Sequence, residues 1–212
     1  MIPTPSRMHV ASDRPPGNPF ATRFTRPGAL EPLDSQGRPL DLEALTVRLR
    51  RARMAAITGP HGHGKTTLLV ALAARLEAEG LPVTVVRVRS RRDWAAVWRA
   101  ISGLPRGGVA CIDGWDSLAA LRGPLRLAAL LLGRTLLVTS HRPGLCPVLW
   151  RCETSRGLLE AIVARLPDRH GRIGGADIAE AFLRHDGDLR ESLAHLYDRF
   201  EQRRWPTARP VA

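Results

Sequence analysis

The sequence predicts an α/β fold, in which a parallel five-stranded sheet carries helices on both faces and a small, wholly helical unit follows it. Short apolar runs that end at a glycine or a polar residue alternate with amphipathic segments, as in sheets whose strands are buried on both faces. The chain has 212 residues, 44% of them hydrophobic, enough for one domain with a sizeable core and a small appendage. From Ser155 onward only helical patterns remain.

The expected elements follow one another along the chain. Asp41 is placed to cap the first helix, and Gly80 to end the second. The predicted strands span 54–58, 82–88, 109–113, 135–139 and 149–153. The predicted helices span 41–53, 66–79, 90–101, 116–132, 156–166, 175–185 and 188–203. In the third of these helices the residues expected on the buried side are Trp94, Val97, Trp98 and Ile101.

These elements divide the chain into four predicted parts. Residues 1–40 hold a proline-rich start, expected to be disordered to about residue 19, and then an irregular arm. The apolar anchors of the arm are Phe20, Phe24, Leu30 and Leu33. Residues 41–154 form the sheet domain, 155–204 the helical unit, called the lid below, and 205–212 a flexible tail.

The chain contains a single lysine, Lys65, against 31 arginines. It lies in Gly59-Pro60-His61-Gly62-His63-Gly64-Lys65-Thr66, a full match to the phosphate-binding pattern G-x-x-x-x-G-K-[ST]. A bias toward arginine explains why lysine is scarce, but not where the one lysine stands. The ammonium group is a compact charge with three donors, whereas a guanidinium group is a bulky planar fork. The flanking strand 54–58 and helix 66–79 supply the strand–loop–helix context that the motif requires.

The motif predicts a nucleotide phosphate site. Glycines let the loop aim its N–H groups at phosphate oxygens, and the helix N-terminus favours negative charge. Lys65 would reach the β and γ phosphates, and the Thr66 hydroxyl would hold Mg²⁺. The predicted binding residues of this segment are Gly59, Pro60, His61, Gly62, His63, Gly64, Lys65, Thr66 and Thr67. The two histidines fill variable positions, and two histidines alone make a poor metal site.

A second acidic element is expected to support the metal. Asp113 ends an apolar strand 48 residues after Lys65, where a Walker B aspartate would hold magnesium through water. The next residue is Gly114, whereas many ATPases have a water-orienting glutamate there. The nearest other carboxylate, Asp116, has two open interpretations: a substitute water-orienting residue, or the N-cap of the following helix.

Two further segments add polar candidates. The fourth strand ends in Thr139-Ser140-His141, where a side chain would sense the γ-phosphate, although ordinary strand-end polarity is an alternative. In the lid, Asp188 and Glu191 predict a capping box. Arg190 opposes the helix macrodipole in that first turn, so it calls for a nearby anion such as a nucleotide phosphate.

The order of the phosphate loop, Asp113, Thr139-Ser140 and Gly187-Asp188-Leu189-Arg190 resembles the AAA+ ATPases over about residues 42–203. The likeness is greatest to the clamp-loader and initiator branches, and the chain is also similar to a group of short bacterial P-loop proteins. The resemblance implies ATP and Mg²⁺ as cofactors and Arg190 as a sensor-2 arginine. It leaves a homo-oligomer open, with Arg142, Arg151 and Arg156 as arginine-finger candidates by location.

The predicted function is therefore an ATP-binding P-loop NTPase, a weak or partner-stimulated ATPase whose catalytic residues are Lys65, Asp113, Asp116 and Arg190. Two alternatives stand beside it: a nucleotide-gated binding module with little turnover, and a small-molecule P-loop kinase. A Ras-like GTPase is excluded because no second lysine is left to form N-K-x-D. A transporter-type ATPase is excluded because no L-S-G-G-Q segment occurs.

Composition bounds the partners and the compartment. The formal net charge of +12 permits contact with nucleic acid, but no single basic stripe dominates. The three cysteines, Cys111, Cys146 and Cys152, form no C-x-x-C pair, which fits a reducing cytoplasm. The N-terminus lacks the apolar run of a signal peptide, and the most apolar stretch, 125–138, is too short and too charged to span a membrane.

Overall fold

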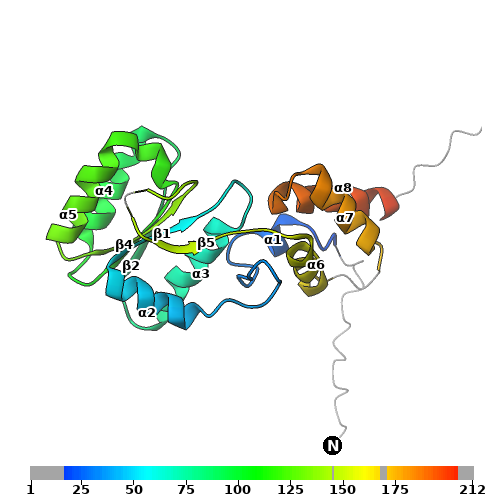
Figure 1. Ribbon diagram of the computed structural model, residues 1–212, viewed down its shortest axis with the longest axis horizontal. Helices are drawn as coiled ribbons and strands as arrows, with labels where there is room; N and C mark the ends of the chain where they lie inside the picture. Colours follow the sequence, from blue (N-terminus) through cyan, green and yellow to red (C-terminus); the bar gives the residue numbers. More distant parts are fainter. Residues whose placement is uncertain (1–16, 145, 168–170, 205–212) are drawn as a thin grey trace, which may run out of the picture.

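The computed structural model describes residues 17–144, 146–167 and 171–204 (Figure 1). The predictions of a disordered start and of a flexible tail concern mostly residues outside these ranges. The sheet contains β1 (Met54–Thr58), β2 (Val83–Arg87), β3 (Val109–Asp113), β4 (Thr135–Ser140) and β5 (Val148–Arg151). All strand pairs are parallel, and their order is β2-β3-β4-β1-β5. The predicted five-stranded parallel sheet is therefore confirmed.

Helices cover both faces of this sheet. Helices α2 (Leu42–Ala52) and α3 (Lys65–Ala78) lie on one face, and α4 (Trp94–Gly103) and α5 (Arg122–Leu131) on the other (Figure 1). Successive strand residues point to opposite faces, so β1 sends Ala55 and Ile57 into the α2–α3 core and Met54 and Ala56 into the α4–α5 core. Every residue of β1 is buried, which explains its almost continuous apolar sequence.

The single helix predicted over 116–132 is wrong. The structure has a 3₁₀ segment, η2 (Trp115–Leu121), and then α5, with a break at Ala119 (φ 47°, ψ −120°). Pro124 accounts for the break: it lacks an N–H, and inside a continuous helix its ring would clash with the preceding turn. Pro124 is the third residue of α5, where an N–H group would have no partner within the helix, so its missing N–H costs no hydrogen bond there.

For the helix predicted over 90–101, the residues expected on the buried side are correct only in part. A short 3₁₀ segment, η1 (Arg91–Asp93), precedes α4, and Ser90 with Asp93 forms a capping box there. Val97 and Ile101 are fully buried, but Trp94 is 48% exposed and Trp98 43%. The two tryptophans flank the stripe that faces the sheet, so only part of each ring is covered.

The lid has a core of its own. Helices α6 (Arg156–Arg165), α7 (Gly175–Arg184) and α8 (Leu189–Arg204) pack together with the N-terminal arm, which contains the short α1 (Thr22–Thr25) (Figure 1). Phe20 is buried with its ring centroid 6.3 Å from that of Phe200. Asn18 Nδ2 donates to the Tyr197 carbonyl oxygen at 3.0 Å. The anchors of the arm thus pack on the lid rather than on the sheet.

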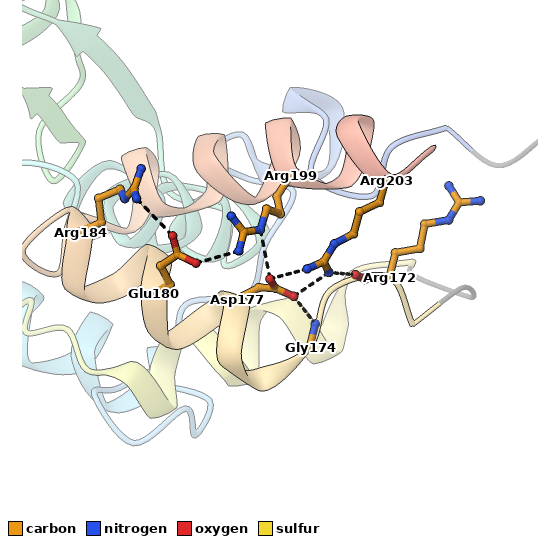
Figure 2. Close-up of polar contacts among 7 residues, drawn as sticks. All are labelled: Arg172, Gly174, Asp177, Glu180, Arg184, Arg199 and Arg203. Carbon is orange, nitrogen blue, oxygen red and sulfur yellow. Dashed lines mark hydrogen bonds and ion pairs between the residues drawn. The ribbon is translucent and has the colours of Figure 1, made fainter. Parts of the chain in front are cut away.

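A buried carboxylate ties α7 to α8 (Figure 2). Asp177 is 6% exposed and accepts two hydrogen bonds of 2.7 Å from the Arg203 guanidinium group. It also accepts from Arg199 Nε at 3.2 Å and from the Gly174 N–H at 2.9 Å. The bonds from Arg203, together with those from Gly174 and Arg199, lower the pKa of Asp177 to about 2.

We expect Asp177→Asn to lower the free energy of unfolding at pH 7 by about 1 to 3 kcal/mol, because it removes charge-assisted bonds from a buried site. The folded-state pKa lies below the ordinary value of 3.8, so this stabilisation is full above about pH 4 and is lost as the pH falls toward 2. Urea unfolding from pH 7 to pH 2 checks this. The difference in free energy of unfolding between wild type and variant should become smaller as the pH falls. A difference that stays constant would contradict the low pKa of Asp177.

Candidate functional site

The carboxyl ends of all five strands meet at one edge of the sheet, next to the loop between β1 and α3. A cavity of about 1310 Å³ opens there, and its walls come from this loop, the strand ends, the arm and the lid. Small-molecule sites usually measure about 300–1,000 Å³. The cavity is therefore large enough for a nucleotide with room to spare.

The loop adopts a conformation that needs its glycines. Gly62 and Gly64 have φ of +69° and +83°, in the left-handed region that side chains disfavour. A Cβ atom on Gly59 would lie 2.6 Å from the Cys152 carbonyl oxygen, and one on Gly62 would lie 1.8 Å from Asp188 Oδ1. The loop thus runs directly against the segment after β5 and against the lid.

Lys65 is the first residue of α3, and its ammonium group lies within the curve of the loop. It donates to the carbonyl oxygens of Gly59 (2.8 Å) and Pro60 (2.5 Å). Burial lowers the pKa of Lys65, and the charge of Arg190 acts in the same direction, against neighbouring acidic groups that include Asp113. Arg190 and Lys65 line the same cavity.

Asp113, at the end of β3, joins two hydroxyl groups. Thr66 Oγ1 lies 3.1 Å from each carboxylate oxygen, and Thr139 Oγ1 donates to Oδ1 at 2.8 Å. Arg87 Nε, from the end of β2, is 3.8 Å away. Hydroxyl and carboxylate oxygens are ligands that Mg²⁺ accepts. The donor set of Thr66 and Asp113 fits the ion that the motif implies.

Gly114 follows Asp113 for a steric reason. Its φ is +94°, and a Cβ atom there would lie 2.3 Å from the Val88 carbonyl oxygen. Since that neighbour is backbone, no side chain fits without moving the chain. The glutamate found after the aspartate in many ATPases cannot be accommodated in this turn.

Asp116 does not cap a helix, so that interpretation is wrong. The N-cap of η2 is Gly114, and no side chain accepts a capping bond there. The Asp116 carboxylate instead accepts from Ser140 Oγ at 2.8 Å and from the His141 N–H at 2.6 Å. Asp116 therefore lies on the cavity wall, beside the end of β4. Its Oδ1 is 3.5 Å from Arg122 Nη1.

The polar end of β4 therefore binds both carboxylates. Thr139 and Ser140 are buried, at 2% and 6% exposure, and their hydroxyls contact Asp113 and Asp116. His141 faces the cavity, with Nδ1 3.5 Å from Lys65 Nζ and its ring 4.0 Å from that of His61. Burial lowers the pKa of His141, and the charge of Lys65 adds to this, which favours the neutral imidazole.

The lid touches the loop through the start of α8. Asp188 is the N-cap, accepting from the N–H groups of Arg190 (2.9 Å) and Glu191 (3.1 Å). The reciprocal bond of a capping box is not made, because the Asp188 N–H donates to the His185 carbonyl oxygen. Arg190 lies on the cavity wall.

Some features of the site carried no signal in the sequence. Arg87 is an ordinary strand-end residue by pattern, and the arm gives no indication that Pro27 and Leu30 line the cavity. Of the arginine-finger candidates, Arg151 lines the cavity, whereas Arg156 pairs with Glu160 at 2.8 Å.

Two kinds of feature are absent from residues 17–144, 146–167 and 171–204. There, no three His, Cys, Asp or Glu side chains are grouped to hold a metal ion. Over the same ranges, none of the helices is both long and apolar enough to cross a membrane.

The parallel sheet, the loop between its first strand and helix, and the converging strand ends define the P-loop NTPase fold. Among solved structures, RuvB from Thermotoga maritima is similar: a point mutant has a TM-score of 0.52 and 22% identity, with 76% of this chain and 58% of that chain covered. A second structure, of the Thermotoga maritima RuvB Holliday junction branch migration motor, has a TM-score of 0.51 and 22% identity, with 76% of this chain and 60% of that chain covered. These similarities concern the fold alone: the two RuvB structures share the parallel sheet and its helices with this chain.

Two curated relatives match a shorter segment. Hemin import ATP-binding protein HmuV is 47% identical over 60 residues in Pseudomonas aeruginosa and 48% identical over 63 residues in Streptomyces coelicolor. Each match covers 28% of this chain, and the chain spans less than a quarter of either relative (23% and 21%). No protein-family model matches the sequence.

We expect Gly62→Ala to loosen the first turn of α8, because its Cβ would meet a carboxylate that two N–H groups hold in place. Overpacking of this kind costs about 1 to 3 kcal/mol, so the amides of Arg190 and Glu191 should exchange with solvent roughly 5- to 100-fold faster. Hydrogen exchange followed by NMR checks this. Gly64→Ala is the matched control, since Gly64 has the same sign of φ but open space around it.

Proposed function

We propose that the protein is an ATP-binding P-loop NTPase whose hydrolysis is weak or depends on a partner, and whose nucleotide state sets the position of the lid. The observation that carries this proposal is convergence on one cavity. Lys65, the Thr66–Asp113 pair and Arg190 come from the loop, β3 and the lid, and all line that cavity. A nucleotide there would contact the sheet domain and the lid together.

The loop residues 59–67 would bind the phosphates through backbone N–H groups. Lys65 would exchange the two loop carbonyl oxygens for phosphate oxygens, which would also raise its depressed pKa again. Thr66 and Asp113 would hold Mg²⁺, which when bound neutralises charge on the β and γ phosphates. On the arm, Pro27 and Leu30 offer an apolar surface on the same cavity for the base.

Hydrolysis requires a group that orients water. Gly114 leaves no room for the usual glutamate, and Asp116 is the carboxylate nearest in sequence that lines the cavity. Its bonds to Ser140 and the His141 N–H fix its direction but also occupy its oxygens. This arrangement supports slow turnover, or turnover that would rise if a partner rearranged the end of β4. Contact of the γ-phosphate with the end of β4 would then change the hydrogen bonds that this segment makes to the two carboxylates. The residues concerned are Thr139, Ser140 and His141.

Titrations of the Arg190→Ala variant with ATP and with ADP test whether the lid contacts the γ-phosphate. Arg190→Ala should weaken the affinity for ATP roughly 10- to 100-fold and the affinity for ADP by much less, since charge-assisted hydrogen bonds contribute about 1.5 to 3 kcal/mol each. Lys65→Ala should lose both nucleotides and serves as the reference for absent binding. Calorimetry measures the affinities. Arg156→Ala is the matched lid control because Arg156 pairs with Glu160. Equal losses for ATP and ADP in Arg190→Ala would remove its assignment as a γ-phosphate sensor.

Turnover of Mg·ATP tests the role of Asp116. We expect slow turnover in the wild type that Asp116→Asn lowers at least about tenfold, because general-base and water-orienting groups typically contribute 10²–10⁴-fold. Phosphate release is followed with and without DNA or RNA. Ser117→Ala, a change to the adjacent cavity residue, is the control. Tight ATP binding with no turnover under any condition would instead favour the nucleotide-gated binding module.

A further inference from the structure

A second hollow lies at the opposite edge of the sheet, where the strands begin. Its volume is about 340 Å³, and its walls include the starts of β3 and β4 and the turns that lead into them. Three arginines line it: Arg50 and Arg53 at the end of α2, and Arg106 before β3. No residue of the phosphate loop takes part, so this hollow is separate from the nucleotide cavity.

Two of these guanidinium groups converge over one glycine. A Cβ atom built on Gly133 would lie 3.5 Å from Arg53 Nη2 and 3.6 Å from Arg106 Nε. Gly133 has φ of +70°, and the absence of a side chain there leaves the space between the two groups open. Like charges brought together in this way repel each other unless an anion lies between them.

The protein supplies no such anion among the residues that the structure describes. Within those ranges, neither the Arg53 nor the Arg106 side chain makes an ion pair or a hydrogen bond with a carboxylate. Arg50 has a partner, Glu79, at 3.6 Å, but Glu79 also binds Arg75 at 3.0 Å. The hollow therefore carries net positive charge.

Arg53 is also held in an unfavourable backbone conformation. It ends α2 with φ of 58° and ψ of −7°, a left-handed position that usually carries glycine or asparagine. Its N–H donates to the Leu49 carbonyl oxygen at 2.8 Å, a bond that a glycine would make equally well. The backbone conformation alone therefore gives no reason for an arginine at this position.

The walls of the hollow are cross-linked by backbone bonds. The Gly107 N–H donates to the Gly133 carbonyl oxygen (2.9 Å), and the Leu136 N–H donates to the Arg53 carbonyl oxygen (3.0 Å). These bonds join the turns that carry the arginines to the start of β4. The backbone from which the two arginines project is therefore fixed, and only their exposed side chains have to become ordered when a ligand binds.

We propose that this hollow, bounded by Arg50, Arg53 and Arg106, is a binding site for a phosphate dianion, either free or as the phosphate monoester of a small molecule. Guanidinium groups match the planar, bidentate pattern of phosphate oxygens, and two of them balance the charge of a dianion. The volume admits a phosphate with a small organic group attached. The site does not depend on the proposed nucleotide function.

The test is a ³¹P NMR titration of the full chain with inorganic phosphate and, separately, with phenyl phosphate. All proteins carry Lys65→Ala, so the phosphate loop contributes little whether or not it binds nucleotide. Arg106→Gln removes one guanidinium group at the hollow. Arg92→Gln is the matched control: it makes the same change of charge at an exposed arginine away from the hollow.

We expect saturable binding that Arg106→Gln weakens roughly 10- to 100-fold and that Arg92→Gln changes by less than about twofold. Tighter binding of phenyl phosphate than of inorganic phosphate would identify a monoester as the ligand, and the reverse order would identify free phosphate. Equal affinities in Arg106→Gln and Arg92→Gln, no saturable binding, or equal displacement by the monoanion acetate would each overturn the proposal.

Arg53→Gly separates binding from folding. It removes the second guanidinium group and relieves the left-handed strain, so phosphate affinity should fall roughly 10- to 100-fold. Its thermal unfolding midpoint should stay unchanged or rise by about 2–4 °C. A purely structural role for Arg53 would give the opposite pair of results: a lower midpoint and unchanged phosphate affinity.

Discussion

The hydrogen bond from Thr139 to Asp113 joins the ends of two adjacent strands, and the geometry of the site depends on it. β4 lies between β3 and β1, so its last residues reach the carboxylate of one neighbour and the phosphate loop of the other. The next residue, Ser140, binds Asp116, and the N–H of His141 does the same. One strand end thereby orients both carboxylates. A parallel sheet makes this possible because all its strands end at the same edge.

The Gly114 turn shows how backbone geometry limits chemistry. The residue after Asp113 passes so close to the Val88 carbonyl oxygen that only glycine fits. The close approach follows from the pairing of β2 with β3, which continues as a bond from the Val88 N–H to the Asp113 carbonyl oxygen (2.7 Å). A water-orienting glutamate is thus excluded by packing in the sheet itself. The carboxylate nearest to Asp113 in sequence, that of Asp116, is held instead by the end of β4.

The features that were predicted from the sequence are those that local pattern determines. The strand 54–58, the loop that ends in Lys65 and the cap at Asp41 depend on neighbours in sequence, and all three lie where expected. The break at Ala119 was missed although its cause, Pro124, is local, because the leucines on both sides keep an apolar pattern. The bonds of Asp116 and the packing of Phe20 on Phe200 join residues far apart in sequence, which periodicity does not report.

The Asp188 carboxylate lies directly against Gly62, so the lid and the loop touch at the start of α8. Asp188 cannot leave this position without uncapping α8, and its negative charge lies beside the segment proposed to bind phosphates. A nucleotide there would meet repulsion from Asp188 and attraction from Arg190, two residues along the same helix. If the proposed nucleotide site is correct, a small shift of α8 would change both distances together, and phosphate charge would then be linked to lid position through one helix end. Under the same proposal, the γ-phosphate would have the largest influence on the position of α8, because it would add negative charge close to Lys65 and Arg190.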